Sequence, residues 1–189
     1  MLGNAAANNA ANRVRIGEEG GVGAVIVAMN MHRDRSKVQE NGCRMLGHAA
    51  VDNPANRLRI VEEGGIRMVV RAMRHHSDKS NIQWSGCRML GHVAVGNAHV
   101  LSRVAQEGAV AAVTDAMRTY RSLPRVQLKG LEALVALAVE GRNLNVPHVV
   151  EQLVANDASE AIQGAINAHR QDVGVQERGQ RALAALQAL

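Results

Sequence analysis

The chain has 189 residues, of which 47% are apolar and 21% are charged, so it can bury a substantial core beneath a charged surface. Phe is absent and only Trp84 and Tyr120 are aromatic, so that core is aliphatic, which suits closely packed helices. No apolar run approaches the roughly 20 residues of a membrane span, and no signal peptide opens the sequence. The mean hydropathy of -0.13 is that of a soluble protein. We therefore expect an intracellular protein, cytoplasmic or nuclear.

The formal net charge of +5 belongs to the N-terminal half of the chain. Residues 1–99 contain 13 Lys and Arg against 8 Asp and Glu, whereas residues 100–189 contain 9 of each kind. Electrostatic attraction of a partner is therefore expected mainly in the first half.

The chain repeats itself with a step of 44 residues. Gly-Cys-Arg-Met-Leu-Gly-His occurs at 42–48 and returns intact at 86–92, and 25 of the 44 positions in 12–55 are identical to those in 56–99. A fainter third copy keeps this register, and a fourth is displaced by five extra residues around 143–157. Such a period predicts one array of stacked repeats. The predicted units are residues 12–55, 56–99, 100–143 and a divergent 144–189, preceded by the end of an earlier repeat at 1–11.

Taken in chain order, the first elements follow from that register. Residues 1–4 align with 45–48, so the chain is expected to begin inside the last helix of a preceding repeat and to belong to a longer array. In the first full repeat, Asn12 is predicted to cap a short helix that ends at Gly20-Gly21. A second helix is predicted over 22–31. The third and longest helix is predicted over 37–51, with Ser36 as its N-cap.

The later repeats are predicted to copy this three-helix plan. Ser80 repeats the N-cap of the third helix, Asn97 repeats the Asn53 that closes the unit, and Pro124 opens the third helix of the third repeat. Pro147 is predicted to open a longer first helix in the fourth repeat. The terminal segment 179–189 reads as an Ala/Leu-rich third helix, and its apolar face is the expected contact if copies of the chain form a homo-oligomer.

This three-helix unit resembles the armadillo repeat. The resemblance rests on Asn-Arg-x-x-Ile-x-Glu-Glu-Gly-Gly-Val at 12–22, Val-Gln-Glu-x-Gly-Cys at 38–43 and Leu-x-x-Ala-Ala at 46–50. It implies an all-α, right-handed α-solenoid whose third helices line a concave groove that holds an extended peptide. A HEAT-type solenoid of helix pairs is the alternative, and the Glu-Glu-Gly-Gly break between two helices argues against it.

Family members hold the peptide backbone with a ladder of asparagines on the third helices. The ladder positions here are Asn4, His48, His92, Ala136 and Ala185. One turn earlier, where nuclear-import members carry tryptophan, the chain has Arg44, Arg88, Glu132 and Arg181. The scaffold therefore resembles the family, but recognition of a lysine-rich localisation signal is not expected.

The third helices are predicted to present a cationic stripe. Arg44 and His48 are four residues apart and share a helix face, and Arg88 with His92 repeats that face. Arginine can clasp a carboxylate or phosphate, and histidine can donate to a peptide carbonyl. We therefore hypothesise a protein or peptide partner with an extended acidic or phosphorylated segment. The candidate groove residues are Asn4, Glu40, Arg44, His48, Trp84, Arg88, His92 and Glu132; the alternative is that the arginines are solvated surface residues.

Other functions are weaker interpretations of the same residues. His48 and His92 lie on neighbouring helices, too far apart for one zinc ion with bonds of about 2.0–2.1 Å, so no metal and no cofactor are expected. No phosphate loop follows a strand, and the repeated Cys43 and Cys87 read as buried core residues and not as a nucleophile, so no enzyme is expected. RNA binding is the alternative function, because the calculated pI is ≈ 10.0. Two aromatic residues offer few stacking platforms, so nucleic acid is not the expected partner.

Overall fold

The computed structural model describes residues 9–189, and this part of the chain forms helices and no strand. The helices are α2 (Ala10–Glu18), α3 (Gly21–Met31), α4 (Ser36–Ala50), α5 (Pro54–Glu62), α6 (Gly65–His75), α7 (Ser80–Val93), α8 (Ala98–Gln106), α9 (Ala109–Thr119), α10 (Pro124–Asn143), α11 (Pro147–Ala155), α12 (Ala158–Ala168) and α13 (Val173–Gln187).

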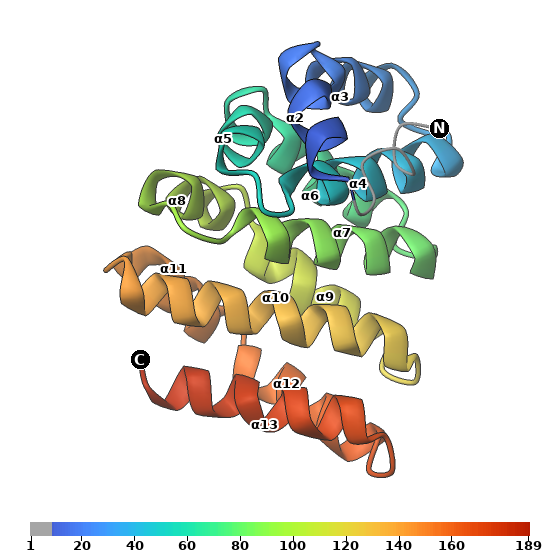
Figure 1. The fold of residues 1–189 in the computed structure, drawn as a ribbon. Helices are drawn as coiled ribbons and strands as arrows, with labels where there is room; N and C mark the ends of the chain where they lie inside the picture. The colour runs from blue at the N-terminus through green and yellow to red at the C-terminus, as the bar shows by residue number, and fades with distance from the viewer. Residues whose placement is uncertain (1–8) are drawn as a thin grey trace.

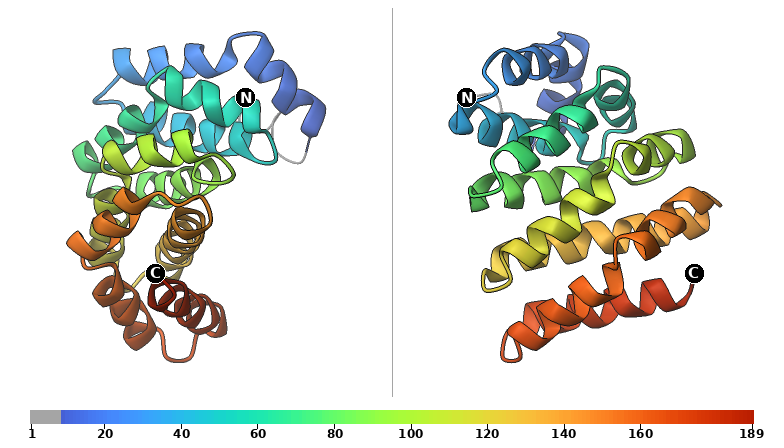
Figure 2. Two further views of the ribbon diagram at one scale, coloured as in Figure 1. Left: turned by 90° about the vertical axis from the view of Figure 1, so that its left-hand side faces the viewer. Right: turned by 180° about the vertical axis from the view of Figure 1, so that it is seen from behind.

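The helices stack in consecutive groups of three (Figure 1). The third helices α4, α7, α10 and α13 run side by side in one row, and each packs against the next. The stack curves, with this row along its inner side (Figure 2). We call this row the inner row. Its side chains that face away from the core form the candidate binding surface.

A glycine in the left-handed conformation separates the first and second helices in three repeats. Gly20, Gly64 and Gly108 have φ of 76°, 78° and 80°. Glycine adopts this conformation without the steric cost that a Cβ brings, so the chain turns sharply after the Glu-Glu or Gln-Glu pair. In the fourth repeat Asp157 takes the same place with φ 49°. The Glu-Glu-Gly-Gly motif therefore marks a turn between two helices, as predicted.

A glutamine joins the second and third helices of every repeat, and it is buried in the first three. The side-chain amide of Gln83 donates to the carbonyl oxygens of Met73, at 2.9 Å, and His76, at 3.0 Å. Met73 lies in the last turn of α6, where carbonyls lack a partner within the helix, so the amide satisfies a group that would otherwise be buried without a hydrogen bond. The carbonyl of His76, the C-cap, also accepts from the backbone N–H of Lys79. Gln39, Gln127 and Gln176 make the corresponding pairs of bonds.

A second set of bonds joins one repeat to the next. The ring Nε2 of His76 donates to the carbonyl of Arg33 at 2.8 Å, and the hydroxyl of Tyr120 donates to the carbonyl of Ser77 at 2.9 Å. His169 repeats the contact with the carbonyl of Arg121 at 2.7 Å. These side chains end the second helices, where the helix dipole favours a polar group. They serve as inter-repeat links.

Three capping predictions were wrong by one to three residues. The N-cap of α2 is Asn9, whose side chain accepts from the backbone N–H of Asn12 at 2.9 Å. Asn56, the counterpart of Asn12, is buried and donates to the carbonyls of Arg13 and Ala49, so this position braces two repeats. The N-caps of α4 and α7 are Arg35 and Lys79 and not Ser36 and Ser80, and no side-chain bond closes either end.

The predicted long first helix of the fourth repeat was also wrong. Pro147 does open α11, but α11 has 9 residues, as α2 has. The additional residues lengthen the preceding third helix instead, because α10 has 20 residues against 15 in α4. That extension, residues 139–143, buries Gly141, where a Cβ would lie 3.1 Å from the Cγ1 of Val149 on α11, so close contact with the next helix accompanies the longer α10.

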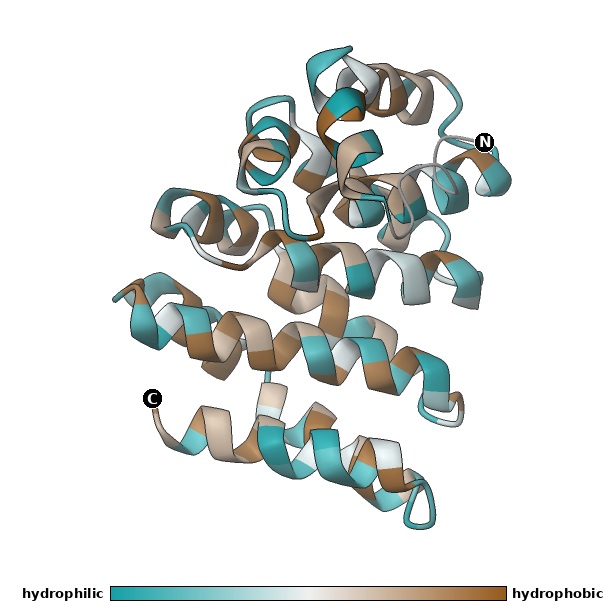
Figure 3. Ribbon diagram, viewed as in Figure 1, coloured by the Kyte–Doolittle hydropathy of each residue, from teal (hydrophilic) through white to brown (hydrophobic). Residues whose placement is uncertain are grey.

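The core is aliphatic and continuous through the stack (Figure 3). Mid-helix glycines allow close approach inside it. A Cβ on Gly47 would lie 3.4 Å from the Cα of Met89 on the next inner-row helix, and a Cβ on Gly91 would lie 3.1 Å from the Cα of Ala133. Helix–helix contact therefore explains why glycine occurs at both positions despite its poor helix propensity.

Candidate functional site

The predicted groove residues lie on the exposed edge of the inner row. On α4 the side chains of Cys43 and Leu46 are fully buried, while those of Arg44 and His48 are only partly buried. Arg88 and His92 repeat this arrangement on α7. The four basic residues therefore come together on two packed helices, as the sequence predicted. Asn4 lies outside the described residues.

The two arginines form the electrostatic centre of this surface. Burial lowers the pKa of Arg88, and the positive charge of Arg44 lowers it further. The Nη2 of Arg44 donates to the side chain of Asn41 at 2.9 Å. Within residues 9–189, the Nε of Arg44 and the Nε and Nη2 of Arg88 are buried from solvent and meet no hydrogen-bond acceptor. Buried N–H groups of a cation without an acceptor are costly, and the oxygen of an anion is the kind of group that would satisfy them.

Trp84 supports one of these arginines. The guanidinium carbon of Arg88 lies 5.4 Å from the centroid of the Trp84 ring, within cation–π range. The tryptophan packs against the core and stays partly exposed. It therefore orients Arg88 and leaves part of the ring available for contact with a ligand.

The histidines are neutral at physiological pH. Burial lowers the pKa of His48 to about 4, and the charges of Arg88 and Arg44 add to that shift. The pKa of His92 is also lowered, first by burial and then by Arg88 and Lys129. Each neutral ring keeps one N–H donor and one acceptor nitrogen. The side-chain amide of a ladder asparagine likewise has a donor and an acceptor.

Acidification is expected to destabilise the protein through these histidines. An unfolded histidine takes up a proton near pH 6.5, whereas native His48 does so only near pH 4, so the unfolded state binds more protons between these values. The free energy of unfolding therefore falls as the pH falls through this window. We expect the thermal unfolding midpoint to drop by several degrees between pH 7.5 and 5.0, and to drop less in His48→Asn/His92→Asn. Equal drops in both proteins would contradict this assignment.

The two predicted acidic residues are neutralised by neighbours. Glu40 pairs with Lys37 at 3.0 Å. Glu132 accepts from Lys129 at 2.6 Å and from Arg178 at 2.9 Å. Burial alone would raise the pKa of Glu132, but these two bonds lower it overall. Neither carboxylate makes an ion pair with Arg44 or Arg88 in the described part of the chain.

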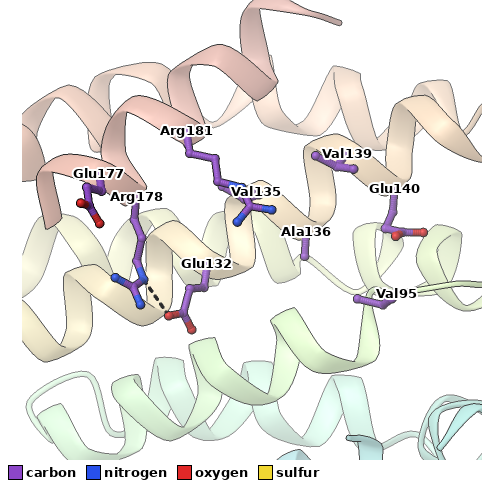
Figure 4. A pocket seen from close by; sticks show the side chains of 9 residues that line it. All are labelled: Val95, Glu132, Val135, Ala136, Val139, Glu140, Glu177, Arg178 and Arg181. Carbon is purple, nitrogen blue, oxygen red and sulfur yellow. Dashed lines mark hydrogen bonds and ion pairs between the residues drawn. The ribbon is translucent and has the colours of Figure 1, made fainter. Parts of the chain in front are cut away.

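Sequence reasoning missed a groove between α10 and α13. Its volume is ≈ 650 Å³, and Arg178 reaches across one end of it to Glu132 (Figure 4). The five inserted residues around 143–157 disturb the 44-residue register, so Arg178 does not align by simple counting. A shift of 49 residues, which superposes Gly130 on Gly179, aligns Arg178 with Lys129. The residues that line this groove are Val95, Glu132, Val135, Ala136, Val139, Glu140, Glu177, Arg178 and Arg181.

Comparison with known proteins decides the family. A family model described as the LRRK2 ARM repeat matches residues 22–188, which is most of the chain. The chain belongs to the armadillo repeat family. The predicted all-α, right-handed solenoid of stacked three-helix armadillo repeats is thereby confirmed. A search of curated proteins found no match.

Several solved structures share the armadillo fold with this chain. A designed armadillo repeat protein, YIII(Dq)4CqI, is 17% identical with a TM-score of 0.82, and the match covers 98% of this chain and 72% of that one. An engineered protein is 23% identical with a TM-score of 0.82 over 98% of this chain, which spans only 42% of that protein. A third, the designed armadillo repeat protein YIII(Dq.V1)4CPAF in complex with peptide (KR)4, is 13% identical with a TM-score of 0.58 over 98% and 90% of the two chains.

The two cysteines of this armadillo chain are core residues. Cys43 and Cys87 are fully buried, and burial raises the pKa of each thiol to about 12. A thiolate nucleophile is therefore not available at physiological pH. Residues 9–189 bring no three His, Cys, Asp or Glu side chains together as metal ligands. Within the same range, each helix is too short or too polar to cross a membrane.

The C-terminal end of the armadillo stack carries an apolar hollow of ≈ 560 Å³. Leu183 and Leu186 of α13 line it, together with Val150, Leu153 and Val154 of α11. This is the face that the sequence suggested for association between copies of the chain, and that contact stays a prediction.

Proposed function

We propose that this armadillo chain is a non-enzymatic scaffold that binds an extended acidic segment of another protein along its inner row. The observation that carries the proposal is the set of three buried guanidinium N–H positions on Arg44 and Arg88 without an acceptor among the described residues. A carboxylate or phosphate supplies oxygen acceptors for such groups and compensates the two positive charges. The excess of Lys and Arg over Asp and Glu in residues 1–99 favours the same kind of ligand.

The repeat geometry suits an extended ligand. Packed helices lie about 8–10 Å apart and an extended chain advances about 3.3 Å per residue, so successive repeats meet every third residue or so. Neutral His48 and His92 then provide donors and acceptors for the peptide backbone. The designed armadillo protein in complex with peptide (KR)4 pairs this fold with a basic peptide. The cationic stripe of this chain supports an acidic ligand instead of a basic one.

A binding measurement with an acidic peptide tests the proposal. Fluorescein-labelled (Glu-Ser)6 is titrated with wild type and with Arg44→Ala/Arg88→Ala, and fluorescence anisotropy gives the affinities. Two lost hydrogen bonds to charged groups, at about 1.5 kcal/mol each, correspond to about 100-fold weaker binding. The control is Arg35→Ala/Arg170→Ala, which removes the same charge from exposed positions at the ends of the inter-helix turns. We expect the control to bind within about twofold of wild type.

Two outcomes would overturn the proposal. Equal affinities of wild type and Arg44→Ala/Arg88→Ala would show that the arginines do not hold the ligand. Tighter binding of an RNA homopolymer than of the acidic peptide, with a steep loss of affinity on adding salt, would assign the stripe to nucleic acid instead.

A further inference from the structure

Exposed apolar side chains gather at the two ends of the stack. Within residues 9–189, every large apolar side chain that is exposed belongs to the first or the fourth repeat, which lie at opposite ends (Figure 1). These side chains are Val14, Val27, Met31, Val154, Val173 and Leu189. Exposed apolar groups that concentrate in separate places mark surfaces that another polypeptide can cover.

The end of the stack formed by α11 and α13 resembles an inter-repeat junction with one side uncovered. A shift of 49 residues aligns Leu183 with Leu134 and Val154 with Ala105. Leu134 and Ala105 are buried in the third repeat, on which the fourth repeat packs through α11 and α13. Leu183 is only partly buried, Val154 is 71% exposed, and both line the apolar hollow of ≈ 560 Å³. The hollow therefore occupies the place where one repeat receives the next.

The opposite end of the stack, at α2 and α3, carries positions that face a preceding repeat. Arg71 and His75, which correspond to Val27 and Met31 in the 44-residue register, bond to side chains of the first repeat at 3.0 Å and 2.9 Å. In the first repeat the same two positions are apolar and are 56% and 72% exposed. Val27 and Met31 therefore suit an apolar surface as their neighbour.

A hydrogen-bonding position recurs at the same two ends. His76, Tyr120 and His169 each donate to a carbonyl of the preceding repeat. Their counterpart in the first repeat is His32, whose side chain is exposed and makes no such bond within residues 9–189. The carbonyl of Arg170 occupies the matching acceptor position at the end of the fourth repeat. The two ends are thus the two halves of one junction.

We propose that these two halves bind each other between copies of this chain, so that copies join head to tail. The occupant of the hollow is the α2–α3 face of a second copy, because the chain already makes this kind of junction between its own successive repeats. Val27 and Met31 lie against the hollow, and His32 donates to the carbonyl of Arg170 in the adjoining copy. The inner row then continues from α13 of one copy to α4 of the next. Such a contact uses two different faces, so association does not stop at a dimer.

Two variants block one face each. Val27→Asp/Met31→Asp places charges on the α2–α3 face, and Val154→Asp/Leu189→Asp places them in the hollow. All four side chains are exposed, so the variants should keep the circular dichroism spectrum of wild type. Each change should weaken association at least about tenfold, because apolar side chains that would be buried are lost and charges take their place.

Sedimentation velocity measures the association of the 189-residue chain. The average mass of wild type should rise steadily from about 1 to 200 µM, because mass action favours the joined copies. Asn81→Asp/Thr119→Asp adds the same charge at exposed positions of the two middle repeats and should associate as wild type does.

An equimolar mixture of the two blocked variants decides the geometry. Each variant alone should stay monomeric but keeps one intact face. The mixture should therefore form a dimer that contains one copy of each variant, and nothing larger.

Four results would overturn the proposal. They are a monomeric wild type at every concentration, a mixture that stays monomeric, an equal loss of association in the control, and association of Val27→Asp/Met31→Asp on its own. The last result would assign the hollow to a symmetric contact between two α11–α13 ends. None of these results bears on the binding of acidic peptides to Arg44 and Arg88.

Discussion

Reversing the charge of both arginines, in Arg44→Glu/Arg88→Glu, is expected to abolish binding of the acidic peptide and to create binding of the basic peptide (KR)4. The variant places two carboxylates where two guanidinium groups lie partly buried on α4 and α7. Like charges repel across such a site, and opposite charges steer and hold the ligand. The peptide (KR)4 is the ligand of a designed armadillo repeat protein of known structure.

The measurement is a titration of both peptides against wild type and the reversed variant at two salt concentrations. Wild type should bind only (Glu-Ser)6, and the variant only (KR)4, with both affinities falling as salt is added. If the variant still binds the acidic peptide, the peptide contacts residues other than Arg44 and Arg88. Circular dichroism provides the folding control, because a helical stack of unchanged content excludes general unfolding as the cause of lost binding.

Replacing Gly86 by leucine is expected to lower the thermal unfolding midpoint by about 5–10 °C. A Cβ at Gly86 would overlap the Sδ of Met73, which is itself fully buried between α6 and α7. The methionine cannot move into solvent, so the leucine overpacks the core at a cost of about 2–3 kcal/mol. For a chain of this size, 1 kcal/mol shifts the midpoint by about 2–4 °C.

The matched control for this change is Gly23→Leu. Gly23 also lies inside a helix, but the nearest atom to its Cβ would be the flexible carboxylate of Glu63. This side chain is exposed and can turn away, so the midpoint should stay within about 2 °C of wild type. An equal fall in both variants would attribute the effect to leucine in a helix and not to the contact with Met73.

The sequence predicted the architecture because the repeat is strong at the positions that determine it. The Gly-Gly turns and the periodic apolar residues of each third helix recur at a fixed step, so the helix order and the shared face of Arg44 and Arg88 could be derived from the sequence alone. The burial of Cys43 and Cys87 followed from their place among core residues and is confirmed.

The features that were missed depend on contacts that spacing does not show. Asn12 and Asn9 are both good N-caps by residue type, and only the start of α2 at Ala10 selects Asn9. The length of α10 depends on how its last residues, 139–143, pack against α11. The Glu132–Arg178 bond joins residues that are 46 positions apart. The inserted segment shifts the register of the fourth repeat, so this pairing cannot be found by counting in steps of 44 residues.

The bonds from His76 to Arg33, from Tyr120 to Ser77 and from His169 to Arg121 each couple one repeat to its immediate neighbour. In such a molecule each repeat contacts only its neighbours, so each junction between two repeats bends independently of the others. Small angular fluctuations therefore accumulate along the spiral. Side chains on adjacent repeats therefore keep a nearly fixed spacing, while the distance between the two ends of the stack varies more.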